Sequence, residues 1–161
     1  MRRRVAALAG LLLVAASVGA CSSQKSGWNA EPAPGIEVSR QGGAEPVVLF
    51  ARGGHPPKTL VTKDAVIGKG PAVNAKSSVY IAYMGVVTST AETIYSSWRI
   101  GHGVSIALSK TPPAWQKGMI GMKPGGTRII IAPPNLLGAK TDSPQYKAGP
   151  VVYVISLVSV S

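Results

Sequence analysis

The stretch Thr111–Leu137, TPPAWQKGMIGMKPGGTRIIIAPPNLL, predicts a short helix, then a tight turn and a strand. In its first half the apolar residues recur every three or four positions, which places them on one helical face. These residues are Ala114, Trp115, Met119 and Met122. Pro112 and Pro113 suit the helix entry and first turn, where a missing backbone N–H costs little. We therefore expect a helix from about Pro113 to Gly121.

The second half of this stretch turns the chain and returns it as a buried strand. Lys123–Gly126 combines a Pro, which presets one dihedral angle, with glycines that allow a positive one, so it predicts a turn. Arg128–Ala132 is rich in β-branched residues and alternates little, so we expect a strand covered on both faces. Pro133 and Pro134 end it. The spacing alone also fits a helix-turn-strand corner of any small α+β domain.

The composition indicates one domain with an N-terminal extension. The 161 residues are 45% apolar and carry a formal net charge of +11, of which the arginines at positions 2–4 supply three, leaving +8 (11 − 3). Cys21 is the single cysteine, so no disulfide can form within the chain. The acidic residues show no pairing pattern, and His55 and His102 lack nearby partner ligands. We therefore expect no metal site and no cofactor.

The N-terminus has the layout of an export signal. Arginines precede the apolar run Ala6–Ala20, which is shorter than the roughly 20 residues that span a bilayer. Val18-Gly19-Ala20 before Cys21 resembles the bacterial lipobox, in which the leader is cut and the cysteine is diacylated. This implies a lipoprotein signal peptide over residues 1–20, lipidation of Cys21, and a protein lipid-anchored on the extracytoplasmic side of the bacterial cell membrane. An ordinary signal peptide that ends near a cysteine is the alternative.

The rest of the chain is divided into a tether and a domain. Residues 21–46 are rich in Gly, Pro, Ser and Glu, so we expect a flexible tether there and a folded domain over residues 47–161. Val47–Phe50 could add an edge strand to this domain. Ser77–Val87 and Pro150–Val160 alternate as strands do. Several strand patterns around one helical pattern predict an α+β fold, an antiparallel sheet of five or six strands wrapped around one short helix.

The order of residues in the opening stretch is more specific than their spacing. Trp115-x-x-Gly118-Met119-x-x-Met122-Lys123-x-Gly125-Gly126-x-Arg128, then Pro133-Pro134-x-Leu136, resembles the central signature of FKBP-type peptidyl-prolyl cis-trans isomerases. The resemblance runs from about Pro57 to Ser161. It implies an FKBP-like domain in which Trp115, carried on the short helix, forms the floor of an apolar pocket for the substrate proline.

The resemblance also implies the site residues and the function. The catalytic candidates are Tyr83, whose hydroxyl would face the pocket, Trp115, and Tyr153 in the place of a pocket Phe. The other pocket candidates are Ile94, Tyr95, Val104, Thr111, Pro112 and Leu137. The implied function is a membrane-anchored prolyl isomerase that assists the folding of exported proteins by binding their proline-containing segments. We expect the protein to be a monomer. We also expect it to bind no nucleic acid, because its lysines are dispersed.

Several positions depart from the family pattern. Tyr95 stands where the family has a pocket Asp, and Ile94 and Val104 stand where it has Phe. Pro112 has no backbone N–H at the position that normally offers one to the substrate carbonyl. The segment Pro133–Gly138 is one residue shorter and lacks the usual Tyr. A non-catalytic binding module that has kept the fold is therefore the alternative function, and a structural envelope lipoprotein without a small pocket is a third.

Overall fold

The computed structural model describes residues 27–138 and 149–161, so the predicted leader, Cys21 and most of the loop before the last strand lie outside it. Among the described elements no helix is long and apolar enough to cross a bilayer. In chain order the elements are β1 (Trp28–Ala33), β2 (Ile36–Arg40), β3 (Val47–Phe50), β4 (Val61–Val66), β5 (Ser78–Val87), β6 (Thr93–Ser96), α1 (Ser97–Ile100), β7 (Val104–Ala107), the 3-10 turn η1 (Leu108–Lys110), α2 (Pro113–Gly118), β8 (Thr127–Ala132), the 3-10 turn η2 (Pro134–Leu136) and β9 (Val151–Val160).

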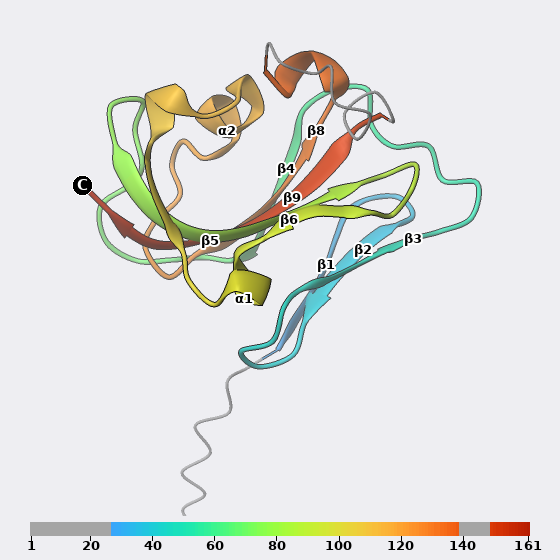
Figure 1. The fold of residues 1–161 in the computed structure, drawn as a ribbon, viewed down its shortest axis with the longest axis horizontal. Helices are drawn as coiled ribbons and strands as arrows, with labels where there is room; N and C mark the ends of the chain where they lie inside the picture. Colours follow the sequence, from blue (N-terminus) through green and yellow to red (C-terminus); the bar gives the residue numbers. More distant parts are fainter. Residues whose placement is uncertain (1–26, 139–148) are drawn as a thin grey trace, which may run out of the picture.

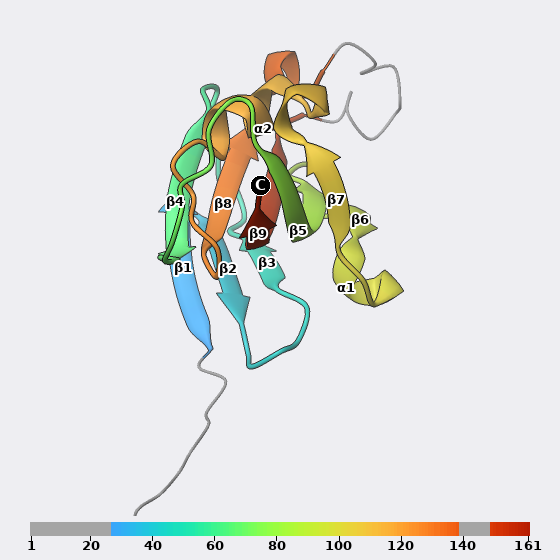
Figure 2. The same cartoon turned by 90° about the vertical axis from the view of Figure 1, so that its left-hand side faces the viewer.

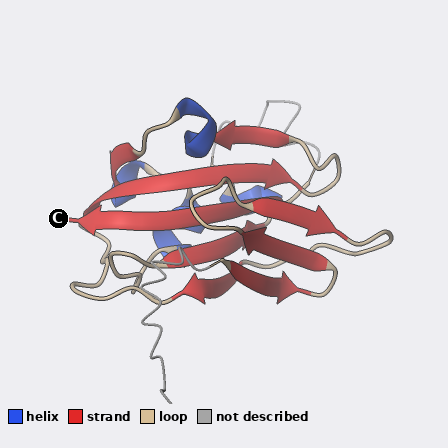
Figure 3. Ribbon diagram, turned by 90° about the horizontal axis from the view of Figure 1, so that it is seen from below, coloured by secondary structure: helices blue, strands red, loops and turns tan. Residues whose placement is uncertain are grey.

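Six of the strands form one antiparallel sheet that curves around α2. Its order is β4-β8-β9-β5-β6, and β7 pairs with the first half of β5 while β6 pairs with its last residues. Figure 1 shows α2 on the concave side of this main sheet, and Figure 3 shows that strands dominate the described chain while the helices are short. The predicted α+β fold, an antiparallel sheet wrapped around one short helix, is confirmed.

Helix α2 packs tightly against the sheet through its apolar face. Trp115 is 5% exposed and Met119 is fully buried. A Cβ added to Gly118 would lie only 2.7 Å from Cδ1 of Ile130 on β8, so glycine allows the helix to approach the strand this closely. The helix ends at Gly118, three residues before the expected Gly121, which takes a positive φ of 81°. The close contact fixes the position of Trp115 over the sheet.

The central strands bury both of their faces. On β9, Val151, Tyr153 and Ile155 join the core beneath α2, whereas Val152 and Val154 belong to a second core on the opposite face. Ile129 and Ile131 of β8 also face this second core, as the unbroken apolar pattern of that strand predicted. A second layer must therefore cover the convex side of the main sheet.

That second layer is a three-stranded sheet built from β1, β2 and β3. The predicted tether is therefore wrong for Trp28–Arg40, and Val47–Phe50 pairs with β2 instead of extending the main sheet. The physical reason is that inward apolar residues alternate with polar ones, so a polar average composition concealed a half-buried sheet; the buried or half-buried inward residues are Trp28, Ala30, Ile36, Val38, Val48 and Phe50. Figure 2 shows this N-terminal sheet beside the main sheet.

The two sheets also meet at α1, a helical turn that the sequence did not predict. The guanidinium of Arg40 at the end of β2 lies 5.3 Å from the ring centroid of Trp98. Nε of Arg99 forms an ion pair with Glu45 in the β2–β3 loop at 3.0 Å. Partial burial lowers the pKa of the Arg40 guanidinium below its ordinary value. The N-terminal sheet therefore contacts the segment that directly follows β6.

Candidate functional site

Three aromatic rings from three elements meet on the concave face of the main sheet. Tyr83 comes from β5, Trp115 from α2 and Tyr153 from β9. The Trp115 ring lies edge-on to both tyrosines, with its centroid 4.7 Å from that of Tyr83 and 5.3 Å from that of Tyr153. Such edge-to-face contacts are favourable for aromatic rings. The structure thus brings the three predicted catalytic candidates together, with Trp115 buried between the sheet and its own helix.

Two further candidates, from β6, extend this group. Tyr95 stacks on Tyr83 with ring centroids 4.3 Å apart and an interplanar angle of 12°. Ile94 approaches Tyr153 over Gly85 of β5, because a Cβ at Gly85 would lie 3.0 Å from Cε1 of Tyr153 and 3.2 Å from Cγ1 of Ile94. At the position where the family pattern has a carboxylate, this chain therefore has an aromatic ring that stacks on Tyr83. We call Tyr83, Ile94, Tyr95, Trp115 and Tyr153 the aromatic site.

The remaining candidates, Leu137, Thr111, Pro112 and Val104, differ in whether they pack into the core around the aromatic site. Leu137, 5% exposed, belongs to the same apolar core at the end of η2. Thr111 is buried, and its hydroxyl is satisfied because it donates to the carbonyl of Leu108 at 2.7 Å. Half-buried Pro112 directly precedes α2. Val104 on β7 pairs with Ile81 and is not among the described residues that pack into this core. The expectation that Val104 helps to line the pocket is therefore not supported by its packing.

The indole N–H of Trp115 lacks, among the described residues, the hydrogen-bond acceptor that would be expected for a buried tryptophan. A buried indole usually finds an acceptor. Here Nε1 of Trp115 is buried, and no described group accepts a hydrogen bond from it. An unsatisfied buried donor costs about 1–3 kcal/mol. An acceptor supplied by a bound molecule would remove this cost, which makes the floor of the aromatic site a place where a polar group of a ligand is favoured.

Residues 70–158 match the FKBP-type peptidyl-prolyl cis-trans isomerase family, and this range contains the whole aromatic site. The chain belongs to the FKBP family. An FK506-binding protein of Streptomyces anulatus is 34% identical to this FKBP chain over 113 residues, which is 67% of this chain and 91% of the relative.

Solved structures show the same FKBP fold. FkpA from Escherichia coli superimposes with a TM-score of 0.57 at 24% identity, over 69% of this chain and 53% of that chain. A peptidyl-prolyl cis-trans isomerase from Pseudomonas syringae pv. tomato gives a TM-score of 0.55 at 18% identity, over 63% of this chain and 75% of that chain. At these identities the likeness concerns the fold alone.

Two residues that support the site of this FKBP domain were not among the predicted site residues. Gly85 leaves the space in which Ile94 and Tyr153 meet. Ser97, 2% exposed, accepts a hydrogen bond from the backbone N–H of Tyr83 at 2.8 Å through its Oγ. Both residues lie in segments that carry the resemblance, but spacing alone does not distinguish a glycine or serine that shapes a site from one in an ordinary strand.

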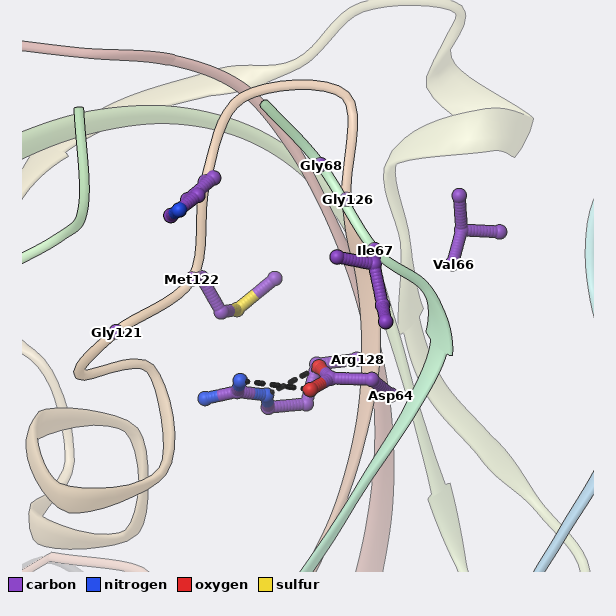
Figure 4. Close-up of a pocket in the computed structure, with 9 residues that line it drawn as sticks. Asp64, Val66, Ile67, Gly68, Gly121, Met122, Gly126 and Arg128 are labelled. Carbon is purple, nitrogen blue, oxygen red and sulfur yellow. Dashed lines mark hydrogen bonds and ion pairs between the residues drawn. The ribbon is translucent and has the colours of Figure 1, made fainter. Parts of the chain in front are cut away.

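An arginine fixes the far end of α2 in the FKBP domain. Nη1 of Arg128 donates to the carbonyls of Gly118 and Ile120, at 2.9 Å each. Its Nε and Nη2 donate to both carboxylate oxygens of Asp64 on β4, as Figure 4 shows. This pair lines a small pocket between β4 and the turn that follows α2. Since the guanidinium is already bonded on three of its nitrogens, we assign it a structural role in holding α2.

We expect Arg128→Met to lower the free energy of unfolding by about 1–3 kcal/mol, because the partly buried Gly118 carbonyl and the Asp64 carboxylate lose their donors. Urea denaturation checks this value. Asp64→Asn is the matched control: it keeps the two carbonyl contacts of Arg128 and removes only an ion pair whose acid is 40% exposed. Its cost should be below about 1 kcal/mol. Equal losses in the two variants would contradict the assigned role of the carbonyl contacts.

Proposed function

We propose that this protein is a peptidyl-prolyl cis-trans isomerase that is anchored to the membrane through a lipid on Cys21 and assists the folding of exported proteins. The observation that carries the catalytic part is the arrangement of Tyr83, Trp115 and Tyr153 on one face of an FKBP domain. The proposed substrates are proline-containing segments of exported chains. The lipobox-like sequence before Cys21 supports the anchoring part.

The aromatic site suits this reaction because prolyl isomerisation needs no nucleophile. The barrier of about 18–20 kcal/mol comes from amide resonance, which is lost when the bond twists. A proline ring placed against Trp115 and Tyr153 would hold the prolyl side in an apolar environment while the preceding carbonyl rotates. In such an environment the planar amide, with its larger charge separation, loses more solvation than the twisted amide, so the twisted amide is favoured relative to the planar one. Tyr83 is the expected hydrogen-bond donor to the substrate.

The second candidate function is ligand binding without catalysis. Pro112 removes the backbone N–H that would hold the substrate carbonyl, and its own carbonyl is already bonded by the N–H groups of Trp115 and Gln116. The ring of Tyr95 stacks on Tyr83 and so restricts the space beside the expected donor. Because one relative is named for binding FK506, we propose that this macrolide is a ligand of the aromatic site in either case.

A protease-coupled assay on Xaa-Pro peptides with several Xaa residues separates the two functions. The uncatalysed bond interconverts in tens to hundreds of seconds, so acceleration by the full chain in mild detergent is readily measured. Acceleration that is inhibited by FK506 supports the isomerase. FK506 binding together with uncatalysed rates for every peptide would overturn the isomerase proposal and establish the binding module.

A further inference from the structure

Helix α1 lies between the aromatic site and the N-terminal sheet. On the side of the site, Oγ of Ser97, the first residue of α1, accepts the hydrogen bond from the N–H of Tyr83. The residue pair just before it, Ile94 and Tyr95, supplies one wall of the site from β6. Any displacement of α1 must therefore move the backbone that carries Tyr95 relative to Tyr83.

On its other side α1 is held by the N-terminal sheet. Trp98 packs into the core between the two sheets, and the guanidinium of Arg40 lies 5.3 Å from its ring centroid. Arg40 is itself fixed, because its Nε donates to the carbonyl of Ala44 at 2.7 Å and its Nη2 to that of Gly43 at 3.2 Å. A cation held over an indole in this way is attracted by the negative face of the ring, so the contact ties α1 to the end of β2.

The strand between α1 and the site has little support of its own. β6 contains four residues, and among the described strands it pairs with β5 alone, through a register shift between Gly85 and Val86. A short strand at the edge of a sheet is held by few backbone hydrogen bonds, so its position depends on side-chain contacts at its ends. The contact between Trp98 and Arg40 is made at the end that lies next to Tyr95.

We propose that Arg40 and Trp98 are positioning residues of the aromatic site, through which the N-terminal sheet holds α1 and β6 and so sets the stacking of Tyr95 on Tyr83. This rests on the proposed function of that site. The N-terminal sheet is then more than a cover for the convex face of the main sheet. From the opposite face of the main sheet, the N-terminal sheet then sets the position of Tyr95 relative to Tyr83. Substrates bind to a β6 wall that is already ordered.

The test compares Arg40→Ala with Arg52→Ala, which removes the same charge from an exposed loop, in the full chain in mild detergent. We expect Arg40→Ala to raise KM for a Xaa-Pro peptide and the Kd for FK506 by about 3- to 10-fold, within the range of couplings through packed networks. The value of kcat should change less, and Arg40→Lys should restore part of the loss. Arg52→Ala should behave as the wild type.

A double-mutant cycle decides whether the effect passes through Tyr95. In a Tyr95→Ala background, Arg40→Ala should have no further effect on Kd, because the ring whose position it controls is absent. Additive losses in the cycle, or wild-type binding by both Arg40→Ala and Trp98→Leu, would overturn the proposal. If Arg40→Ala does not fold, Glu45→Gln is measured instead, since it releases α1 at the neighbouring Arg99.

Hydrogen exchange keeps this test independent of the proposed function. The amide of Tyr83 donates to Ser97, so its exchange rate reports whether α1 is in place. We expect Arg40→Ala to accelerate this exchange by about 3- to 10-fold while amides of β8 and β9 are unchanged. A wild-type protein that neither isomerises peptides nor binds FK506 would refute the proposed function, and unchanged Tyr83 exchange in the variant would refute the positioning role.

Discussion

Replacing Trp115 with alanine is expected to lower the free energy of unfolding by about 3–5 kcal/mol, the usual cost of removing a buried aromatic side chain. The ring is 5% exposed and lies edge-on to Tyr83 and Tyr153, so its loss leaves a cavity at the centre of the concave face. The substrate proline would lose its floor at the same time. We expect binding of FK506 and of Xaa-Pro peptides to fall below detection in the folded fraction of this variant.

Trp115→Phe separates the structural role from the binding role. Phenylalanine keeps most of the buried apolar area. We therefore expect urea denaturation to show a free energy of unfolding lower than that of the wild type by only about 1 kcal/mol. It also removes the unsatisfied indole N–H, which relieves a cost in the free protein. Weaker FK506 binding despite near-normal stability would support Nε1 as a donor to the ligand. Unchanged binding in both variants would place the ligand elsewhere.

Replacing Cys21 with serine is expected to abolish incorporation of a radiolabelled fatty acid such as palmitate and to release the protein or leave it uncleaved. The reason is that Cys21 is the only thiol in the chain, and a lipid anchor cannot move to another residue. Each buried CH₂ of such an anchor contributes about 0.8 kcal/mol, so two or three chains hold a protein firmly and their loss is decisive.

Ser22→Ala is the matched control for this substitution, because it changes the neighbouring residue and keeps the thiol. It should label as the wild type does. Fractionation of cells into membrane and soluble material gives a second readout, in which wild type and Ser22→Ala remain with the membrane. Equal labelling of wild type and Cys21→Ser would remove the lipid anchor from the proposed function and leave the isomerase part standing.

The elements of the main sheet were predictable because local pattern and tertiary environment agree there. The alternation in Ser77–Val87 placed Tyr83 on the same face as Val79 and Ile81, and all three pack toward α2. The apolar face of the helix allowed one orientation of Trp115. In both cases the sequence contains enough polar residues to distinguish an inner face from an outer one.

The N-terminal sheet was missed because its strands are short and their outward residues dominate the composition. Glu31, Glu37 and Ser39 point outward and read as a solvated segment, while Ile36 and Val38 are too few to form a periodic signal. These strands are stabilised by packing against the convex face of the main sheet. A short stretch of sequence contains no information about that contact. For the same reason the stacking of Tyr95 on Tyr83 could not be predicted, because it depends on how β6 is held.

The first described strand begins at Trp28, and its distance from Cys21 along the chain limits how far the domain can lie from a lipid anchor. Six residues separate Cys21 from Trp28, and seven peptide steps extend at most about 25 Å. With lipid on Cys21, Trp28 would stay within that distance of the bilayer surface, and the domain that follows it would be confined to the layer directly above the membrane. Such a protein would sample the narrow zone directly above the membrane, where newly exported chains emerge, and would not reach polypeptides released further from the cell.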